Sequence, residues 1–449
     1  MSFGDQLPKI VVPPPGPRSR ALSADLRELE APGVNTLPTL PTLPEGSPLP
    51  SSILWEEAQG SNVRDVDGNI YIDLTAGFGV AAVGHRHPKV VEAVRHQAGE
   101  LLHALGDVHA HPRRVELARL LVALAPVDDA QVFFAISGSE AVEIALKTAL
   151  GATGRPGILA FDPSYHGMTL GALAVTSRPE FRDPFAAHLH ENVRRRPFGG
   201  GLESVDEALA GGEVGAVIVE PIVGREGVLI PPAGWLAGLA EIGRRRGALL
   251  IADEIFTGFG RTGRLFAVDH EGVRPDILCC GKAMGGGLPI AAVLARRDLF
   301  RCWETSGEAR HTATFIANPL ACAAALAAVA VIQESDLSAR AARLGEDLGR
   351  RLAGWPQRFP AVEEVRGRGL LWGIQLRTAK DAKTWMLAAW SRGVLLLAGG
   401  PEGRVAQLVP PLTIREEQLA AAVGILEEEM AGLRGCLKRS VSDSAVARD

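Results

Sequence analysis

The sequence predicts an α/β protein with a mostly parallel sheet covered by helices on both faces. Short apolar segments of strand length recur between residues 130 and 281, and segments with helical periodicity separate them. A parallel sheet that is buried on both faces is built from such continuous apolar strands joined by helical crossovers. The expected strands are 130–136, 156–161, 214–220, 247–254 and 276–281, with helices that begin near residues 139 and 233.

Outside this alternating region the pattern changes, and we expect five regions along the chain. They are a proline-rich arm, the first part of a small domain, a large domain, the second part of the small domain and a disordered tail: 1–50, 51–85, 86–335, 336–435 and 436–449. The repeated prolines predict an arm that is extended along another part of the protein. The dipeptide Asp67-Gly68 lies between two alternating runs and predicts a β-hairpin. Helical periodicity follows over 87–125, and the apolar run 320–332 predicts a buried helix.

Composition excludes several classes of protein. The 449 residues are 47% hydrophobic and 22% charged with a net charge of −5, which is ordinary for a globular protein and favours neither a nucleic acid nor a membrane as partner. No apolar run approaches the roughly 18 residues that span a bilayer, and the N-terminus lacks the apolar core of a secretory signal. Five cysteines form neither a metal-binding spacing nor a disulfide framework. We therefore expect no metal and a reducing, cytoplasmic location.

Lys282 is the most informative single residue. Lysine is scarce, with seven lysines against forty arginines in the total of 47, yet Lys282 directly follows the apolar strand 276–281 and precedes a triple glycine at 285–287. A lysine that is removed from water beside apolar strands has a lowered pKa and a nucleophilic amine. In a parallel α/β sheet ligands bind at the carboxyl ends of the strands, where Lys282 would lie.

Two other strand ends carry groups that suit a ligand. Asp253 closes the strand 247–254, and its carboxylate could hold a protonated ring nitrogen, although a structural ion pair would look the same. Tyr165 and His166 follow the strand 156–161 on a short loop, where an aromatic ring either covers a planar ligand or fills the loop.

The strand 130–136 leads into a helix whose start resembles an anion site. Ser137 and Glu140 have the spacing of a capping box, so the backbone N–H groups of Gly138 and Ser139 would be free at the helix N-terminus. A plain helix cap has the same pattern. Pyridoxal 5′-phosphate is the one ligand that needs all these features, because it has a phosphate, a flat ring, a pyridine nitrogen and an aldehyde that condenses with lysine.

These residues stand in motifs that resemble a known family. The segments "SGSEA", "YHG", "ADEIFTGFGRTG", "GKAMGGGLPIAAVLA" and "HTATFIANPLACAAALA" resemble the class III, ω-aminotransferase or 4-aminobutyrate aminotransferase-like, pyridoxal-phosphate enzymes of fold type I, in order and spacing over about residues 50–430. The resemblance implies a large domain with a mostly parallel seven-stranded sheet, a small α+β domain built from N- and C-terminal segments, and a homodimer with the active site at the interface.

The resemblance also assigns roles to residues. It implies that Lys282 forms the Schiff base with the cofactor and moves the proton, and that Asp253 pairs with the ring nitrogen. The other expected cofactor-binding residues are the phosphate-binding pair, the residues over the ring, the substrate-side glutamate and a threonine from the partner subunit: Gly138, Ser139, Tyr165, His166, Ile255, Glu220 and Thr314.

Substrate recognition departs from the family pattern. Met168 replaces an arginine after "YHG", Gln407 replaces the arginine that grips a carboxylate, Arg225 replaces the glutamate partner of that arginine, and Phe256 replaces a glutamine. Together with Phe78 these are the expected substrate-binding residues. The predicted reaction moves an amino group from an amine or amino acid to a keto acid, with Arg225 able to compensate for the missing arginine and an apolar or uncharged distal part on the substrate. The alternative on the same fold is an amino-acid racemase or epimerase, for which Lys282 would serve equally.

Overall fold

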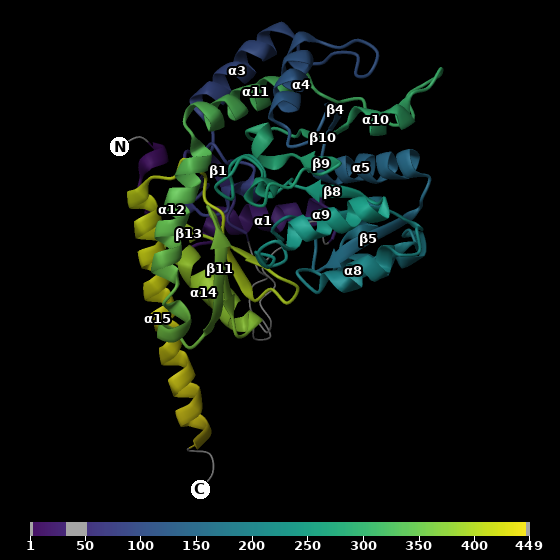
Figure 1. The fold of residues 1–449 in the computed structure, drawn as a ribbon. Helices are drawn as coiled ribbons and strands as arrows, with labels where there is room; N and C mark the ends of the chain where they lie inside the picture. Colours follow the sequence, from purple (N-terminus) through teal and green to yellow (C-terminus); the bar gives the residue numbers. More distant parts are fainter. Residues whose placement is uncertain (1–2, 33–51, 446–449) are drawn as a thin grey trace.

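The computed structural model describes residues 3–32 and 52–445 and has a seven-stranded sheet at its centre (Figure 1). The strand order is β4-β10-β9-β8-β7-β5-β6, and β10 alone runs antiparallel to its two neighbours. The strands are β4 (Ala130–Ala135), β5 (Gly157–Asp162), β6 (Val193–Pro197), β7 (Val214–Val219), β8 (Leu249–Asp253), β9 (Ile277–Cys280) and β10 (Ala291–Arg296). The prediction of an α/β fold with a mostly parallel sheet is confirmed.

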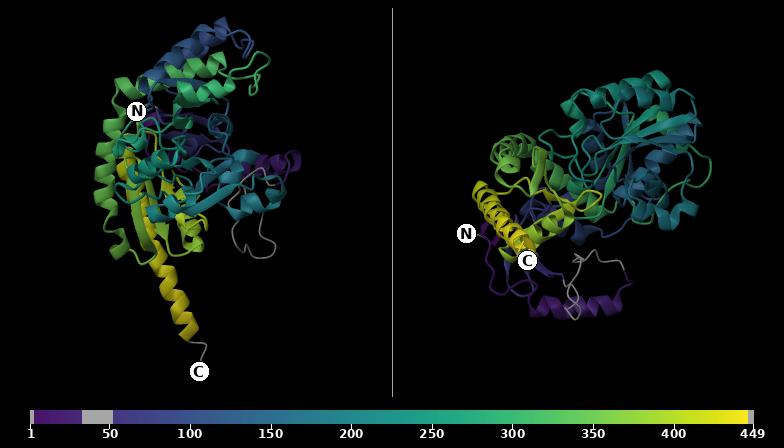
Figure 2. Two further views of the ribbon diagram at one scale, coloured as in Figure 1. Left: turned by 45° about the vertical axis from the view of Figure 1, so that its right-hand side comes forward. Right: turned by 90° about the horizontal axis from the view of Figure 1, so that it is seen from below.

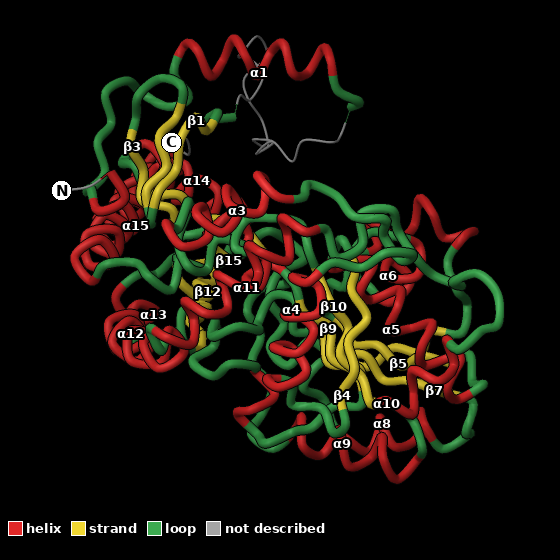
Figure 3. The backbone as a smooth tube through the Cα atoms, turned by 90° about the horizontal axis from the view of Figure 1, so that it is seen from above, coloured by secondary structure: helices red, strands yellow, loops and turns green. Residues whose placement is uncertain are grey.

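Both faces of this sheet are buried because successive apolar side chains alternate between them. In β9, Leu278 and Cys280 join the core on one face, whereas Ile277 and Cys279 join the core on the other. Helices α5 (Gly138–Thr153) and α6 (Leu170–Val175) cover the second face, and α8 (Leu202–Leu209) and α9 (Trp235–Arg246) cover the first (Figure 3). The carboxyl ends of the parallel strands are left open to a ligand.

Two smaller sheets form the rest of the body. The predicted hairpin at Asp67-Gly68 is present, and its second strand pairs in parallel with a strand from near the C-terminus. One small sheet has the order β1-β2-β3-β13: β1 (Trp55–Gln59), β2 (Asn62–Asp65), β3 (Ile70–Asp73) and β13 (Val394–Leu395). The other has the order β11-β12-β15-β14: β11 (Val362–Arg368), β12 (Leu371–Leu376), β15 (Val405–Leu408) and β14 (Leu397–Gly399). Segments far apart in sequence therefore make one unit, as the fold class predicts.

The remaining helices pack around these sheets (Figure 2). They are α2 (Ala76–Gly79), α3 (Pro88–Glu100), α4 (Pro112–Leu124), α7 (Pro179–Arg182), α10 (Arg297–Phe300), α11 (Pro319–Glu334), α12 (Leu337–Leu352), α13 (Trp355–Arg358), α14 (Ala379–Ser391) and α15 (Glu416–Ala445), with short 3₁₀ turns η1 (Phe3–Asp5), η2 (Asp183–His188), η3 (Ala267–His270), η4 (Lys282–Gly285) and η5 (Arg301–Trp303). Helix α11 is buried along most of its length, as predicted. Within the described part of the chain no single helix is long and apolar enough to cross a membrane; α11 and the helical segment after it reach that length only across a 60° bend.

Two predictions about the ends of the chain were wrong. The N-terminal arm is not extended throughout, because α1 (Pro17–Leu29) forms within it. The Asp67 carboxylate accepts hydrogen bonds from the backbone N–H groups of Arg18 and Ser19, at 2.8 and 2.9 Å, and so satisfies the free end of this helix. At the other end α15 continues to Ala445 where a disordered tail was expected. Residues 33–51 of the arm and 446–449 of the tail lie outside the described residues.

Candidate active site

Lys282 lies at the open end of the large sheet, two residues after β9. Its backbone φ is +41°, a left-handed conformation that a residue with a side chain adopts at a cost of about 1 kcal/mol or more. The Nζ atom lies 3.9 Å from the centre of the Phe256 ring, and it makes no hydrogen bond with any residue that the structure describes. Burial lowers the pKa of this amine to about 8, although Asp253 and Glu220 oppose the shift. Lys282 therefore has a buried amine with a lowered pKa at the end of an apolar strand, as the sequence predicts.

The glycines after Lys282 have a packing role that the sequence did not reveal. A Cβ atom on Gly286 would lie 2.9 Å from the Cβ of Ala328 in α11. The residue also has a φ of +58°, which favours glycine. Gly286 thus lets the turn η4 pack closely against α11.

Asp253 and His166 form a buried pair beside this lysine. His166 Nδ1 lies 2.7 Å from Asp253 Oδ2, with the two side chains 0% and 4% exposed. The other carboxylate oxygen of Asp253 accepts a hydrogen bond from the backbone N–H of Ile255 at 3.1 Å. His166 Nε2 is buried and has no hydrogen-bond partner among the described residues. The pair holds a carboxylate at a fixed point in the pocket, where it can bind a cationic ring nitrogen.

Glu220 closes the next strand end and organises the loop that follows it. Its two carboxylate oxygens accept backbone hydrogen bonds at 2.9 Å, one from Tyr165 and one from Gly224. Burial raises the pKa of Glu220 to about 7, His166 acts against this shift, and Asp253 adds to it. Glu220 therefore fixes the positions of two loops that face the lysine.

The N-terminus of α5 has the arrangement of backbone groups that the sequence leads us to expect. Ser137 caps the helix by accepting a hydrogen bond from the Glu140 N–H at 3.2 Å, while the Glu140 carboxylate accepts one from the Ile136 N–H at 2.7 Å. The Ser137 half of the predicted capping box is present, whereas Glu140 accepts from the N–H of Ile136, one residue before the position that a capping box uses. The backbone N–H groups of Gly138 and Ser139 make no hydrogen bond with a described residue, so they are free for a phosphate.

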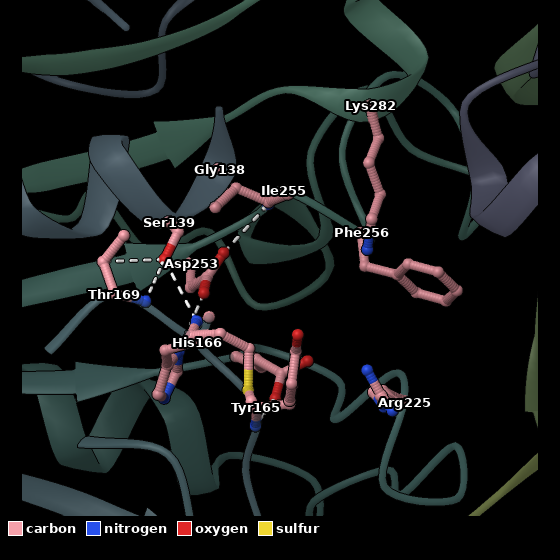
Figure 4. A pocket seen from close by; sticks show the side chains of 13 residues that line it. Gly138, Ser139, Tyr165, His166, Thr169, Arg225, Asp253, Ile255, Phe256 and Lys282 are labelled. Atoms are coloured by element: carbon pink, nitrogen blue, oxygen red, sulfur yellow. Dashed lines mark hydrogen bonds and ion pairs between the residues drawn. The ribbon is translucent and has the colours of Figure 1, made fainter. Parts of the chain in front are cut away.

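Most of the predicted site residues line one pocket of about 450 Å³ (Figure 4). The pocket contains the lysine, the aspartate–histidine pair, the glutamate, the start of α5 and several residues of the expected substrate side: Lys282, Asp253, His166, Glu220, Gly138, Ser139, Tyr165, Ile255, Met168, Arg225 and Phe256. They come from five different loops and helix starts, all at the carboxyl ends of strands.

Three predicted residues do not line this pocket. Gln407 is 3% exposed, and its side-chain amide donates to the carbonyl oxygens of Gly224 and Arg225 at 2.9 and 3.1 Å. The loop carbonyls occupy its N–H donors, so the side chain is directed to the loop rather than to the pocket. Phe78 is 60% exposed and Thr314 is exposed beside Gly106, and neither is among the residues that line the pocket.

The sequence reasoning missed several residues that the pocket uses. Thr169 lies in it, and its hydroxyl is 2.8 Å from that of Ser139. Ser139 also accepts hydrogen bonds from the backbone N–H groups of Met168 and Thr169, at 3.1 and 3.0 Å. The ring of Phe181 packs edge-on against Tyr165, with 6.3 Å between centroids. The polar and aromatic residues in the segment after "YHG" could have indicated that it contributes to the site. The fold is needed to show that this segment turns back over α5.

The residues of the pocket fit pyridoxal phosphate. Free N–H groups at a helix start suit the phosphate, and Tyr165 and Ile255 provide apolar surface for a flat ring. A Cβ atom on Gly167 would lie 2.3 Å from the Ser139 hydroxyl oxygen, so only glycine allows this loop to approach the anion site. Asp253 and Lys282 supply the carboxylate and the amine that the ring nitrogen and aldehyde require.

The fold and this site define a pyridoxal-phosphate-dependent enzyme of fold type I. Comparisons with known proteins agree, since a family model described as aminotransferase class III matches residues 45–430. The chain belongs to the class III aminotransferases. It is 42% identical to the acetylornithine aminotransferase of Methanopyrus kandleri over 372 residues, which cover 83% of this chain and 92% of that one. The acetylornithine aminotransferase of Mycobacterium tuberculosis is also 42% identical, over 83% of this chain and 90% of that one.

Solved structures give the same result. The ornithine aminotransferase of Toxoplasma gondii superposes with a TM-score of 0.83 at 30% identity, covering 92% of this chain and 95% of that one. An amine transaminase from an uncultivated Pseudomonas species, in its form with bound pyridoxal phosphate, has a TM-score of 0.80 at 30% identity over 87% and 97% of the two chains. The protein is thus a pyridoxal-phosphate-dependent aminotransferase, and these relatives do not support the racemase alternative.

Proposed function

We propose that the protein transfers an amino group from a primary amine that carries a carboxylate to a keto acid, with Lys282 as the residue that binds the cofactor aldehyde. The observation that carries this proposal is the Lys282 amine, whose pKa burial lowers to about 8, in one pocket with Asp253 and a free helix N-terminus. When bound, pyridoxal phosphate supplies an aldehyde that takes up the substrate amine and a ring that accepts the electron pair left by a departing proton.

Residues of the chain would have three roles in that chemistry: binding the phosphate, keeping the ring nitrogen protonated and transferring a proton. Gly138 and Ser139 would hold the phosphate through their backbone N–H groups. Asp253, kept in place by His166 at 2.7 Å, would keep the ring nitrogen protonated by its negative charge. With its pKa lowered to about 8, the Lys282 amine would take a proton from one carbon and return it to another.

We further propose that the substrate is uncharged apart from its amine and one carboxylate. Met168 and Phe256 give the pocket an apolar wall. The two curated relatives named above are acetylornithine aminotransferases, and acetylornithine has one carboxylate, one free amine and a neutral amide. It is the first amine to test.

We propose in addition that two copies form the working unit and that Thr314 serves the site of the partner. Exposed apolar side chains gather near Thr314: Leu101, Leu102, Leu105, Val108 and Phe315, each at least 39% exposed. We call them the Thr314 patch. His103 packs on Phe315 at 5.3 Å between ring centroids, and Asn318 donates to the Leu102 carbonyl oxygen at 3.1 Å, so the two segments of the patch are adjacent. Such a patch is typical of a protein interface.

A cytoplasmic location is part of the proposal. It is supported by the four cysteines that the structure describes, which are all free thiols, three of them buried.

A single-turnover experiment tests the reaction. The holoenzyme is mixed with acetylornithine and other primary amines without any keto acid, and one equivalent of carbonyl product per active site is expected. Solvent deuterium at the carbon that bears the reacting amine, without carbonyl product, would contradict transamination; loss of optical activity in an amine that is chiral at that carbon would indicate a racemase.

A further inference from the structure

Arg225 stands on the wall of the active-site pocket with its charge unpaired. Its guanidinium carbon lies 4.4 Å from the centre of the Tyr165 ring and 5.3 Å from that of Phe181. The side chain makes no hydrogen bond or ion pair with any residue in the described ranges 3–32 and 52–445. Stacking occupies the faces of a guanidinium and leaves its in-plane N–H donors available.

A neighbouring arginine has the opposite arrangement. Arg178 also lies over Phe181, at 5.3 Å, but its Nε donates to Glu226 Oε2 at 2.7 Å and a terminal nitrogen donates to the Gly400 carbonyl oxygen at 2.7 Å. Its charge is therefore balanced inside the protein. Of these two arginines, Arg225 is the one whose guanidinium makes no hydrogen bond or ion pair with a described residue, so its charge is left for a ligand.

The backbone of Arg225 is held firmly on both sides. The Gly224 N–H donates to Glu220 at 2.9 Å, and the Gly400 N–H donates to the Arg225 carbonyl oxygen at 3.1 Å. The Gln407 amide bridges the carbonyl oxygens of Gly224 and Arg225. A group whose position is fixed before binding loses little freedom when a ligand arrives. Gln407 is thus a positioning residue for Arg225.

The charged residues of the pocket indicate which anionic group Arg225 is positioned to bind. Its lining contains two residues with long cationic side chains, Arg225 and Lys282, together with His166, which is bound to Asp253. Lys282 lies where the amine of a substrate must react. In Figure 4 Arg225 appears on the opposite side of the view from Ser139 and Thr169, which lie at the anion site of α5. It is therefore placed for an anionic group of the substrate rather than for the phosphate.

We infer that Arg225 binds the carboxylate of the substrate and that the enzyme selects amines with a single carboxylate. A guanidinium can grip a carboxylate through two parallel N–H···O bonds. A second carboxylate would meet Met168 and Phe256, whose apolar side chains cannot replace the water it loses. This inference specifies the substrate class of the proposed function and rests on it.

The first test compares substrates that differ by the carboxylate alone. Holoenzymes of the wild type, Arg225→Gln and Arg225→Lys are assayed with an ω-amino acid and with the primary amine of the same chain length. For Arg225→Gln we expect KM for the amino acid to rise roughly 10- to 100-fold, the effect of losing a charge-assisted hydrogen-bond pair, while KM for the amine rises much less. Arg225→Lys should recover part of the loss, because it keeps the charge without the two-pronged geometry.

A binding measurement separates this inference from the reaction. Straight-chain monocarboxylic acids without an amine are titrated into the holoenzymes by calorimetry, alongside dicarboxylic acids of the same length. The wild type should bind the monocarboxylates more tightly, and Arg225→Gln should lose that binding. Arg274→Gln, which changes a surface arginine paired with Asp128, is the matched control and should bind as the wild type does.

Equal losses for amino acid and amine, unchanged monocarboxylate binding in Arg225→Gln, or tighter binding of the dicarboxylates would each overturn the inference. If no amine reacts at all while the monocarboxylates still depend on Arg225, the proposed function fails and the carboxylate site stands.

Discussion

His166 Nδ1 lies 2.7 Å from Asp253 Oδ2, and both side chains are buried at the carboxyl ends of their strands. The two residues are 87 positions apart in the sequence. Because the histidine occupies one oxygen and the Ile255 N–H occupies the other, the carboxylate cannot rotate away from the pocket. This pair gives the site a negative charge of fixed position.

Asp253→Asn should therefore impair catalysis more than folding. The amide keeps the size of the side chain but cannot hold a proton on the cofactor ring, so we expect kcat to fall by roughly 10²- to 10³-fold. Glu254→Gln is the matched control, since Glu254 is adjacent but bonds to Thr257 and to the Val268 N–H in the core. Steady-state kinetics measure kcat for both variants, and similar losses of kcat in Asp253→Asn and Glu254→Gln would contradict the role of Asp253.

Glu254 itself should make stability depend on pH. Burial raises its pKa to about 7 from 4.5, so the folded protein retains a proton that the unfolded chain has lost between those values. The favourable contribution is complete below about pH 4.5 and is lost as the pH rises through 7. Thermal unfolding at pH 5 and pH 8 should show a larger fall in Tm for the wild type than for Glu254→Gln. Equal falls would show that Glu254 is ionised throughout.

Lys282 should set the pH dependence of cofactor uptake. The amine must lose its proton before it can attack the aldehyde, so the rate at which cofactor-free protein captures pyridoxal phosphate should rise with pH and level off above about 8. The positive charge of Arg225 contributes to the low pKa, and Arg225→Gln should move the midpoint to higher pH. Stopped-flow absorbance measures this rate. A wild-type midpoint near the ordinary lysine value of 10.5 would contradict the burial of the amine.

The Thr314 patch should hold the proposed dimer together. Leu102→Asp places a charge in the patch, and we expect ultracentrifugation to show monomers with weakened cofactor binding. Leu150 on α5 is also exposed, at 50% against 60% for Leu102, and Leu150→Asp should remain dimeric. Thr314→Ala should keep the dimer but weaken cofactor affinity about 2- to 12-fold, the value of one hydrogen bond. An active Leu102→Asp monomer would contradict a site shared between subunits.

Much of the site could be predicted because a parallel sheet brings the carboxyl ends of its strands together. Asp253 and Lys282 each end an apolar strand, so the strand pattern alone predicts that they are neighbours. β6 and β10 are missing from the predicted strands, each for its own reason. The edge strand β6 carries three arginines and no apolar pattern, and β10 follows a glycine-rich turn and runs antiparallel.

What could not be predicted depends on contacts between distant loops. Gln407 looks like a substrate residue in the sequence, but its amide is bound to a loop about 180 residues earlier. The unpaired state of Arg225 follows from the pairing of Glu226 with Arg178 instead, which no local pattern encodes. Helix α1 forms despite the surrounding prolines because Pro17 stands at its first position and Asp67 caps it.

The central claim is that Lys282 carries the cofactor, and covalent trapping tests it most directly. The holoenzyme is reduced with borohydride, digested and mapped by mass spectrometry, with Lys282→Ala as the control. We predict that the reduced pyridoxyl group is found on Lys282 alone among the seven lysines and is absent from the variant. A pyridoxyl group on another lysine of the native enzyme, or its persistence in Lys282→Ala, would contradict the account.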